Sequence, residues 1–551
     1  MSRLPHELAE QVEAWIDQDP DPITAAAAGE LLTRARRGDD AAIDELASCF
    51  AGPLEFGTAG LRAALGPGPS RMNRVVVTRA AAGLGAHLQD IGAKGGLVLV
   101  GHDARYNSDV FARDTVEVLA GIGFDAVLID EPVPTPVVAF GIKHLGAVAG
   151  VVVTASHNPA ADNGYKVYLG DGIQIIPPSD AQIARRIAQV ATVGLDRVPR
   201  ADSYRTAGPE LIEAYLDRAV QVARPPQHEL RWVYTPLHGV GTRYITELAT
   251  RAGFTAPHVV PAQAEPDPAF STVAFPNPEE PGALDLAFAH AARVGAHLII
   301  ANDPDADRCA VAIPTVDGWR RLTGDEVGWL LADDLLRHDT SGTYATTVVS
   351  STLLAKLAAA HGERHATTLT GFKWISRAEG LVFGYEEAIG YCTDPEAVAD
   401  KDGLTAALRL LTLVCELAAR GESLATRLDE IARTHGLHLT DQIALRVDQQ
   451  DELERLMARA RRKPPVGLIG EVVTVTDLAE GGELPATDAV QWAGRGLRVV
   501  LRPSGTEPKL KCYLELACPA GDDLAATRAR QTARMAELRT AVQQLLDRYA
   551  G

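Results

Sequence analysis

The sequence predicts an α/β protein of several domains, in which short buried strands alternate with helices. Its 551 residues are several times the length of a typical domain, so about three to five domains are expected. Hydrophobic residues make up 46% of the chain and charged residues 23%, which is typical of folded globular proteins and excludes a disordered or coiled-coil chain. Short apolar runs repeatedly end at a polar loop and are followed by amphipathic stretches, as in α/β folds.

The elements behind this prediction follow one another along the chain. Helices are expected within residues 1–50, where Leu8, Val12 and Trp15 recur at helical spacing. Apolar runs that end at polar loops predict strands at Gly96–Val100, Ala126–Ile129, Ala149–Val153, Ala296–Ile300 and Leu497–Leu501. Long helical patterns cover Leu404–Arg420, Leu424–Thr434 and Asp522–Tyr549. Because α/β folds bind ligands at the carboxyl ends of strands, a functional site is expected in the loops that follow them.

The net charge of the chain limits the kinds of partner that the protein is expected to bind. Acidic residues outnumber basic ones, 72 against 53, for a net charge of −19. This disfavours nucleic-acid and anionic-membrane binders, which need a broad positive field, but allows a small anionic substrate held by clustered basic groups. No apolar run reaches the roughly 18 residues that span a bilayer and no signal-peptide pattern opens the chain, so a cytoplasmic protein is expected. Six scattered cysteines without a C-x-x-C pair predict reduced thiols.

The loop Thr154–Pro159 (TASHNP) directly follows a predicted strand and is the first candidate site. Ser156, with His157 beside it, suits a nucleophile or a carrier of a phosphoryl group. Ser, Asn and Pro are also turn residues, so the hexapeptide alone fits a plain turn as well. Lys166 lies on the next short predicted strand, which places a cation only a loop away from Ser156.

The loop Asp303–Arg308 (DPDADR) carries three carboxylates after another predicted strand. In extended backbone, residues at i, i+2 and i+4 point to one side, so Asp303, Asp305 and Asp307 are expected to converge. Carboxylates this close need a cation, and oxygen ligands select a hard ion such as Mg²⁺. The alternative is a solvated acidic loop. An EF-hand is excluded because its sixth position, normally Gly, is Arg308, a residue that can instead hold a phosphate by two hydrogen bonds.

The loop Arg502–Lys509 (RPSGTEPK) also follows an apolar strand. Its hydroxyls, its central glycine and its flanking cations predict a phosphate cradle without the spacing of a P-loop, although a turn between strands is the alternative. Gly384–Gly390 places two adjacent carboxylates between glycines, which suits hydrogen bonding to sugar hydroxyls, although an exposed loop fits the motif equally well. Glu55–Arg62 is a glycine-rich loop that ends in an arginine. Basic residues lie in or beside every one of these motifs despite the acidic total: Arg62, Lys166, Arg308, Lys373, Lys401, Arg502 and Lys509.

Taken in order along nearly the whole chain, these motifs resemble those of the α-D-phosphohexomutase superfamily. Thr154–Pro159 is similar to its phosphoserine loop, Asp303–Arg308 to its metal loop, Gly384–Gly390 to its sugar-binding loop and Arg502–Lys509 to its phosphate-binding loop. Three further segments resemble one branch, which holds bacterial phosphoglucomutases and phosphomannomutases as well as phosphopentomutases: Glu55–Arg62, Thr235–Gly241 and Gly371–Ile375.

The resemblance implies three related mixed α/β domains and a C-terminal α+β domain around a central cleft. We expect domain I at 1–205 with the N-terminal helices and the phosphoserine loop, domain II at 206–318 with the metal loop, domain III at 319–437 with the sugar loop and domain IV at 438–551 with the phosphate loop. The implied reaction interconverts hexose 1-phosphate and hexose 6-phosphate, of glucose or mannose, through a phosphoserine enzyme and a bisphosphorylated sugar.

The resemblance also implies roles for particular residues. One Mg²⁺ would be held by Ser156, Asp303, Asp305 and Asp307, and a sugar 1,6-bisphosphate would act as activator. The other catalytic residues would be Arg62, His157, Lys166 and Arg308, with His157 and Lys166 the candidates to handle the hydroxyl proton. Substrate would be bound by Lys373, Glu386, Glu387, Lys401, Arg502, Ser504, Gly505, Thr506 and Lys509. Small sugar phosphates are the expected partners, without nucleic acid or membrane, and the chain is expected to be a monomer or homodimer.

Two departures from the family pattern keep alternatives open. Ala388 stands where many relatives have a serine in the sugar loop, and Ala63 stands where a glycine often follows the arginine of the first loop. Within the family the alternatives are a phosphopentomutase, acting on ribose or deoxyribose 1- and 5-phosphates, and a glucose 1,6-bisphosphate synthase. Outside it they are a phosphatase or transferase with Asp303 as nucleophile, and a non-catalytic sugar-phosphate sensor.

Overall fold

The computed structural model describes residues 4–447, 450–504 and 509–550, which form two compact units. Unit 1 comprises Met1–Val311 and Asp394–Arg409, and unit 2 comprises Ala312–Thr393 and Leu410–Gly551. Two elements run from one unit into the other, strand β10 (Cys309–Thr315) and helix α14 (Gly403–Ala419). Each unit is described by itself below.

Unit 1 begins with three helices, as the opening residues predict: α1 (His6–Gln18), α2 (Pro22–Arg36) and α3 (Asp40–Cys49). Helix α2 begins after Asp21, whose carboxylate accepts a hydrogen bond from the amide of Ile23 and so satisfies one free N–H of the first turn. Val12, Leu32 and Leu46 form the small apolar core that holds the three helices together.

A six-stranded sheet follows, with strand order β1-β5-β4-β2-β3-β6. Its strands are β1 (Leu61–Ala64), β2 (Leu97–His102), β3 (Asp125–Leu128), β4 (Ala149–Val153), β5 (Asp162–Leu169) and β6 (Arg205–Thr206). Strand β2 is parallel to β3 and β4, and β5 is antiparallel to β4 and β1. The predicted strands in this region are therefore confirmed.

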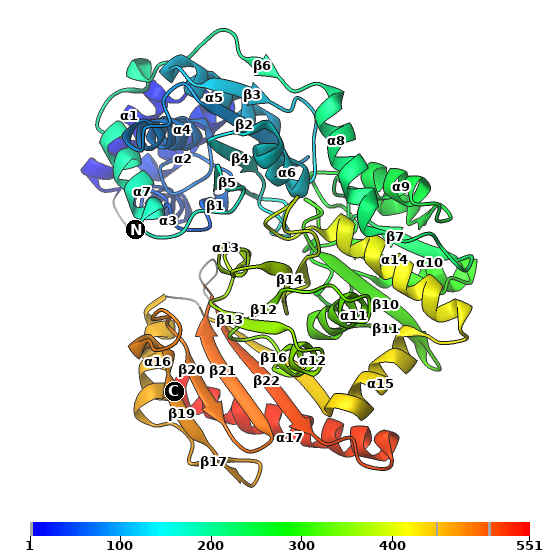
Figure 1. The fold of residues 1–551 in the computed structure, drawn as a ribbon. Helices are drawn as coiled ribbons and strands as arrows, with labels where there is room; N and C mark the ends of the chain where they lie inside the picture. Colours follow the sequence, from blue (N-terminus) through cyan, green and yellow to red (C-terminus); the bar gives the residue numbers. More distant parts are fainter. Residues whose placement is uncertain (1–3, 448–449, 505–508, 551) are drawn as a thin grey trace. The chain divides into compact units, whose positions relative to one another are not determined.

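Helices cover both faces of this sheet (Figure 1). Val98 and Val100 of β2 belong to the apolar core shared with α4 (Arg74–Asp90), α5 (Ser108–Ile122) and α7 (Ser179–Val190). Leu99, which points the other way, packs beside Gly141 of α6 (Thr135–Leu145) together with a leucine of α8 (Pro209–Ala219).

Unit 1 contains a second sheet in which β10 is followed by β9 (Leu298–Asn302), β7 (Trp232–Thr235) and β8 (His258–Val259). Strands β7 and β9 are parallel with Thr235 opposite Ala301, so the loops that follow them leave from the same edge. Helices α9 (Gly241–Arg251) and α10 (Asp285–Val294) complete this part. Between them the chain is irregular apart from β8 and the short 3₁₀ helix Pro261–Gln263.

In unit 2, β10 continues into an antiparallel pair with β11 (Gly318–Arg321), and helix α11 (Gly324–Arg337) follows. A four-stranded sheet has the order β13-β12-β14-β15, from β12 (Thr343–Thr347), β13 (Arg364–Thr368), β14 (Leu381–Glu386) and β15 (Gly390–Cys392). The helices α12 (Leu353–Ala360), α13 (Phe372–Ile375) and α15 (Leu424–His435) belong to the same part.

The C-terminal part of unit 2 is an antiparallel sheet with the order β16-β22-β21-β20-β19 (Figure 1). Its strands are β16 (Leu437–Arg446), β19 (Thr474–Asp477), β20 (Val490–Ala493), β21 (Leu497–Pro503) and β22 (Lys509–Cys518), and a small hairpin joins β17 (Gly467–Leu468) to β18 (Glu471–Val472). Buried Trp492, Leu538 and Leu546 join the sheet to α16 (Gln450–Arg462) and α17 (Leu524–Ala550) in one core.

The mixed α/β fold class is confirmed in both units, because helices and several sheets alternate through the chain. None of the six cysteines forms a disulfide. A search of the described residues finds no helix that combines the length and the apolar character needed to cross a membrane.

Candidate active site

Ser156 lies in the loop after β4, where its backbone takes a left-handed conformation with φ of 51°. A non-glycine residue in this region is strained, which is common at functional positions. The side chain is almost fully buried, and its hydroxyl donates a 2.7 Å hydrogen bond to Oδ2 of Asp303. Nδ1 of His157 lies 3.2 Å from the same oxygen. The structure therefore brings the predicted serine and the first predicted metal ligand into direct contact.

Arg105 holds the serine loop in place, and the sequence reading missed it. Its buried guanidinium donates hydrogen bonds to the carbonyl oxygens of Ser156 at 2.6 Å, Asn158 at 2.5 Å and Pro159 at 2.8 Å. A cation surrounded by carbonyls fixes a loop of irregular backbone that cannot hydrogen-bond to itself. The only signal for it in the sequence is the polar stretch that follows strand β2.

The three aspartates converge, but not in the way the sequence predicted. Asp303, Asp305 and Asp307 are completely buried, and one carboxylate oxygen of each lies within 4.8 Å of the others. The expectation of extended backbone was wrong: the loop turns at Ala306, which has a left-handed φ of 52°. The turn, rather than the alternation of a strand, aims the side chains at one point.

Neighbouring loops hold this turn by close backbone contacts. The amide of Val240 donates to the carbonyl of Pro304 at 2.9 Å, and a Cβ on Gly239 would lie only 2.3 Å from Cα of Pro304. The loop after β7 thus needs a glycine where it crosses the metal loop. Thr135, which the sequence reading also missed, donates from its hydroxyl to Oδ2 of Asp305 at 2.8 Å.

Two lysines partly neutralise the aspartates. Nζ of Lys166 lies 2.7 Å from Asp305 and 2.9 Å from Asp307, and Nζ of Lys401 lies 3.3 Å from Asp307. Burial opposes the charge of Lys166, but the two carboxylates outweigh it and keep its pKa above the ordinary value. Burial also opposes the charge of Asp305, whose pKa is nevertheless kept low, chiefly by Lys166. Lys401, predicted to bind substrate, is therefore placed beside the predicted metal ligands.

The carboxylates that remain under-compensated fit a divalent cation. Burial raises the pKa of Asp303 well above its ordinary value, and the charges of Asp305 and Asp307 add to the effect. Oδ1 of Asp305 and Oδ1 of Asp307 are buried and accept no hydrogen bond from the described residues. Buried carboxylate oxygens without donors are costly unless a cation meets them. Three buried carboxylates around one point, two of them with a free oxygen, are the kind of oxygen donor set that Mg²⁺ prefers.

Two arginines predicted to take part in catalysis flank this centre. Arg62 of β1 donates to Oδ1 of Asn158 at 3.1 Å, within the serine loop. Nε of Arg308 lies 3.8 Å from Asp307 and 3.9 Å from Asp303. Burial, reinforced by the charge of Arg308, lowers the pKa of Arg62. Two guanidinium groups near each other beside the predicted nucleophile Ser156 suit the binding of an anion.

The predicted sugar-binding carboxylates lie in unit 2, in the turn between β14 and β15. Glu386 ends β14, and Glu387 follows it with a carboxylate that accepts hydrogen bonds from the hydroxyls of Ser350 at 2.8 Å and Thr347 at 3.2 Å. Ile389 closes the turn with a left-handed φ of 54°. Lys373 lies in the one-turn helix α13 of the same unit.

The predicted phosphate-binding residues lie at one end of the β21–β22 hairpin of unit 2. Arg502 pairs in register with Lys511, and the amide of Ser504 donates to the carbonyl of Lys509 at 2.7 Å. Gly505 and Thr506 lie outside the described residues. Arg502, Ser504 and Lys509 thus lie together, as adjacent parts of one hairpin.

The same hairpin carries a buried carboxylate that nothing in the sequence singled out. Oε1 of Glu515 accepts hydrogen bonds from the hydroxyl of Ser351 at 2.7 Å, from the amide of Thr352 at 2.9 Å and from His438 Nδ1 at 2.9 Å. Oε2 accepts from Nε of Arg498 at 3.1 Å, and Arg498 also donates to the carbonyl of Val348 at 2.9 Å. This network ties the hairpin to the segment 347–352, the segment that also holds Glu387.

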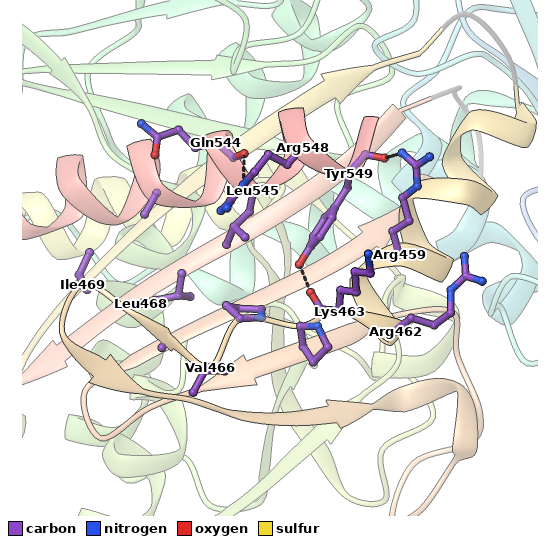
Figure 2. Close-up of a pocket in the computed structure, with 14 residues that line it drawn as sticks. Arg459, Arg462, Lys463, Val466, Leu468, Ile469, Gln544, Leu545, Arg548 and Tyr549 are labelled. Carbon is purple, nitrogen blue, oxygen red and sulfur yellow. Dashed lines mark hydrogen bonds between the residues drawn. The ribbon is translucent and has the colours of Figure 1, made fainter. Parts of the chain in front are cut away.

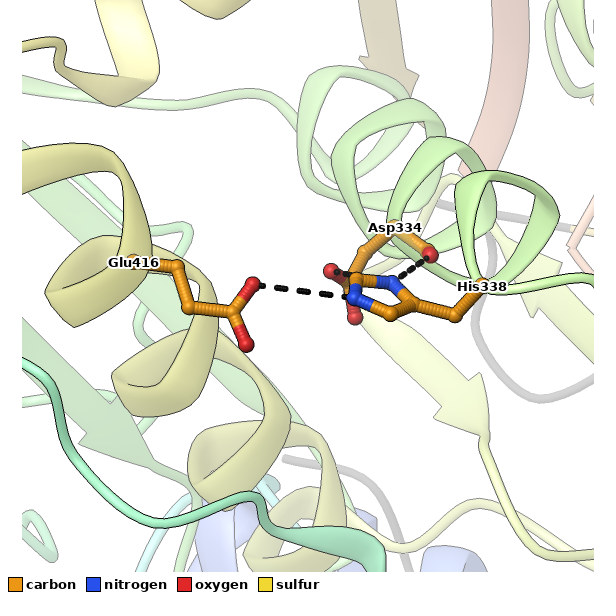
Figure 3. A group of neighbouring side chains, drawn as sticks. All are labelled: Asp334, His338 and Glu416. Carbon is orange, nitrogen blue, oxygen red and sulfur yellow. Dashed lines mark hydrogen bonds and ion pairs between the residues drawn. The ribbon is translucent and has the colours of Figure 1, made fainter. Parts of the chain in front are cut away.

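A second group of potential metal ligands, Asp334, His338 and Glu416, lies where α11 approaches α14 in unit 2 (Figure 3). Nδ1 of His338 lies 2.7 Å from the carbonyl of Asp334, and its Nε2 lies 3.9 Å from Glu416. A guanidinium nitrogen of Arg337 lies 3.8 Å from Asp334. Arg337 faces Asp334 and the His338 ring lies between the two carboxylates, so these contacts link the two helices.

Comparison with known proteins identifies the family. Four phosphoglucomutase/phosphomannomutase models match the chain: alpha/beta/alpha domain I over residues 53–193, domain II over 212–318, domain III over 323–435 and the C-terminal domain over 472–536. The probable phosphomannomutase of Haemophilus influenzae is 44% identical over 452 residues, which is 81% of this chain and 93% of that protein. The phosphopentomutase of Homo sapiens is 34% identical over 582 residues, which is 94% of this chain and 92% of that protein.

A solved structure supports the same assignment. The putative phosphomannomutase from Thermus thermophilus superposes with a TM-score of 0.69 and 27% identity, covering 90% of this chain and 99% of that one. The expected architecture of three α/β domains and a C-terminal domain is thereby confirmed. The chain belongs to the phosphoglucomutase/phosphomannomutase family and is a phosphomutase, an isomerase of the intramolecular phosphotransferase type.

Proposed function

We propose that this enzyme interconverts hexose 1-phosphates and hexose 6-phosphates, of glucose or mannose, with Ser156 as the residue that carries the transferred phosphoryl group. The observation that carries the proposal is the 2.7 Å hydrogen bond between the Ser156 hydroxyl and Asp303 within the buried aspartate triad. A nucleophilic oxygen beside a divalent-cation site is the arrangement that phosphoryl transfer requires.

The metal is part of the proposal. The family is magnesium-dependent, and Asp303, Asp305 and Asp307 would hold one Mg²⁺ together with an oxygen of phosphorylated Ser156. When bound, the ion supplies positive charge at the oxygens of the transferring phosphoryl group. Arg105 fixes the carbonyls around Ser156, so the nucleophile is held in one position before substrate arrives.

The reaction consists of two phosphoryl transfers, one from Ser156 to the sugar and one from the sugar back to Ser156. A hydroxyl of the bound sugar monophosphate attacks phosphorus on Ser156, so that the new O–P bond forms as the Ser156 Oγ–P bond breaks and a sugar bisphosphate results. The bisphosphate then turns, and Ser156 Oγ attacks the other phosphate, whose bond to the sugar breaks. Arg62 and Arg308 stabilise the charge that develops on the transferring group. A sugar 1,6-bisphosphate is the activator because it phosphorylates the free enzyme.

The attacking hydroxyl must lose its proton, and His157 and Lys166 are the two candidates to handle that transfer. His157 lies 3.2 Å from Ser156 Oγ, and Lys166 contacts two of the aspartates. Replacing each by a residue of similar size, His157→Gln and Lys166→Met, separates their roles. The acceptor is the residue whose loss lowers kcat while KM for the sugar phosphate stays constant.

Residues of unit 2 would bind the ring hydroxyls of the sugar and the phosphate that is not reacting. Glu386 and Glu387 suit hydrogen bonds to ring hydroxyls, with Lys373 nearby in sequence, and Arg502, Ser504 and Lys509 suit a phosphate. We assign Gly505 and Thr506 to the same phosphate site from the sequence motif. Lys401 would act at the reacting phosphate instead, since its ammonium lies beside Asp307.

The carrier residue is tested by labelling. Incubating the enzyme with Mg²⁺ and glucose 1,6-bisphosphate labelled with ³²P should transfer label to Ser156, and the label should survive hydroxylamine. Ser156→Ala should neither take up label nor turn over substrate, whereas Ser203→Ala, an exposed serine of unit 1, should behave as wild type. A hydroxylamine-sensitive label, or near-normal turnover by Ser156→Ala, would show that Ser156 is not the carrier.

A phosphopentomutase is the second candidate, favoured by two observations. The human phosphopentomutase matches over 94% of this chain, and Ala388 lacks the hydroxyl that many relatives place beside the sugar. Initial rates on glucose, mannose and ribose 1-phosphates decide between them, and release of free glucose 1,6-bisphosphate as the main product would identify a synthase. If the hexose assignment is correct, Ala388→Ser should raise kcat/KM for glucose 1-phosphate relative to ribose 1-phosphate.

A further inference from the structure

Unit 2 has a pocket of about 1,090 Å³ between the end of α16 and the last turns of α17 (Figure 2). This volume lies slightly above the range of roughly 300–1,000 Å³ that is usual for small-molecule sites. None of its 14 lining residues is among the residues proposed above to bind substrate. The pocket is therefore a separate feature of the C-terminal part of the molecule.

The lining of this pocket is strongly basic. Four of the lining residues are cations, Arg459, Arg462, Lys463 and Arg548, and none of the 14 is an aspartate or glutamate. The chain as a whole carries a net charge of −19, so the charge of the pocket lining is opposite in sign to that of the whole chain. Such a local positive field attracts a polyanion.

Three of these cations have no carboxylate partner within the described part of the chain. Arg462 and Arg548 each donate only to the carbonyl one helical turn earlier, Ala458 and Gln544, both at 3.2 Å, and Lys463 forms no ion pair there. By contrast, Arg461 on the same helix pairs with Asp477 at 2.9 Å and with Asp488 at 2.5 Å. Arg461, which does not line the pocket, is thus neutralised, whereas Arg462, Lys463 and Arg548 have no carboxylate partner among the described residues and are available to an external anion.

The remaining lining of the pocket is largely apolar. Val466 is 84% exposed, and the buried Leu468 lies behind it. The rings of two consecutive prolines, Pro464 and Pro465, and of Tyr549 also line the pocket, with the Tyr549 hydroxyl donating to the carbonyl of Lys463 at 2.5 Å (Figure 2). Rigid rings beside an exposed valine suit a planar apolar group rather than a hydrated one.

We infer that this pocket binds a nucleoside polyphosphate. The base would lie on the apolar wall formed by Pro464, Pro465, Val466 and Tyr549, and the phosphates would meet Arg462, Lys463 and Arg548. Three uncompensated cations match the charge of a di- or triphosphate better than that of a monoanion. The inference does not depend on which sugar phosphate the enzyme isomerises, because the pocket shares no residue with that site.

Calorimetric titration of the full chain with ATP tests the inference, with EDTA present so that neither Mg²⁺ nor turnover contributes. ATP should bind, tripolyphosphate should bind at least fivefold more weakly because it lacks the base, and adenosine should give no heat. Raising the salt concentration from 50 to 300 mM should weaken ATP binding. No heat with ATP, or equal affinity for tripolyphosphate, would overturn the assignment.

Matched variants locate the bound ATP. Arg462→Glu with Lys463→Glu should raise the Kd for ATP at least tenfold, while Arg455→Glu, on the same helix but outside the lining and paired with Asp451, should leave it within twofold. Arg502→Ala should leave ATP binding unchanged and weaken sugar-phosphate binding. The opposite pattern, with ATP binding lost only in Arg502→Ala, would place ATP in the phosphate loop and refute the proposal. If the double variant does not fold, Lys463→Gln and Arg548→Gln, checked by thermal melting, carry the same test.

Discussion

Buried carboxylates in the two units differ in whether their oxygens accept hydrogen bonds. In unit 1, Asp305 and Asp307 each have a buried oxygen that no described donor satisfies, although two lysines lie beside them. In unit 2, both oxygens of Glu515 are hydrogen-bonded, to side chains and an amide of the surrounding segments. Burial is nearly equal in the two places. In this comparison, unsatisfied acceptors rather than burial distinguish Asp305 and Asp307, which are proposed to act in the chemistry, from Glu515, which supports the fold.

The sharpest test of this comparison is the loss of one charge from the triad. Asp305→Asn should lower kcat by about 100-fold to 1,000-fold or more, because the charge that would hold the metal is reduced. The melting temperature should fall as well, because the buried ammonium of Lys166 loses the charge of one of its carboxylate partners. Steady-state rates over a range of Mg²⁺ concentrations, with and without EDTA, measure the effect. Wild-type kcat at saturating Mg²⁺ would break the comparison, and Asp325→Asn in unit 2 serves as the matched control.

Glu515 should differ from Asp305 in having a large effect on stability and no direct effect on the chemistry. Glu515→Ala should cost about 3 kcal/mol of unfolding free energy, because it leaves buried His438 and partly buried Arg498 without the carboxylate that they share. Urea unfolding followed by hydrogen exchange in β16, β21 and β22 measures this loss. Labelling of Ser156 by the bisphosphate should persist in the folded variant, and its disappearance would contradict the assignment of Glu515 to architecture.

The pH dependence of Glu515 sharpens the same point. Burial works against its charge, but His438 and Arg498 lower the pKa of Glu515 from 4.5 to about 2. The folded state therefore binds this proton less readily than the unfolded state, so the contribution to stability is full above pH 4.5 and is lost as the pH falls toward 2. Wild type should lose stability relative to Glu515→Gln over this range. A constant difference between the two proteins from pH 5 to pH 3 would refute the explanation.

Asp325 gives a smaller effect of opposite sign. Burial, with help from Glu387 and Glu515, raises the pKa of Asp325 from 3.8 to about 7, even though it accepts hydrogen bonds from the amide of Ser351 and from Tyr385. Its ionisation therefore opposes folding increasingly as the pH rises from 3.8 to 7. Asp325→Asn should stabilise the protein more at pH 8 than at pH 5, with a difference in melting temperature of roughly 4 °C. Equal shifts at both pH values would contradict this.

Loss of a helix cap should have the smallest effect on stability. Each unit has such a cap, so the two losses can be compared directly. Thr323 begins α11 with a capping box, accepting from the amide of Glu326 at 3.1 Å while Glu326 accepts from its amide at 2.9 Å. Thr323→Ala and Asp21→Ala, the cap of α2 in unit 1, should each cost about 1 kcal/mol. Thermal melting measures the loss, and kcat should remain unchanged in both. A change in kcat for either variant would mean that local stability and catalysis are coupled.

The sequence predicted the strands and the two loops of unit 1 well, for a local reason. Strands buried on both faces are nearly continuous apolar runs, so Ala149–Val153 and the run before Asp303 were visible without tertiary information. The loops that follow them are short and chemically distinct. The N-terminal helices were also visible, since Val12 and Trp15 repeat at helical spacing.

Contacts between distant segments were not visible. Arg105 reaches carbonyls more than fifty positions away, and Glu515 accepts hydrogen bonds from Ser351 and His438, which lie 164 and 77 positions away. No periodicity or spacing encodes such pairs, because they arise only when separate strands and helices are placed together. The left-handed backbone of Ser156 was hidden for a related reason, since serine rarely adopts it unless its surroundings compel it.

For this protein the sequence by itself determined which chemical groups are available and on which loops they lie, because residue type and local hydrophobic pattern are properties of short segments. Only the tertiary structure decided that the turn at Ala306, rather than an extended strand, gathers the three aspartates, and that Ser156 meets Asp303 across 147 positions. Convergence of this kind depends on the backbone of neighbouring loops, such as the close contact between Gly239 and Pro304. The free energy that stabilises such a contact comes from packing of the whole unit, which no single segment contains.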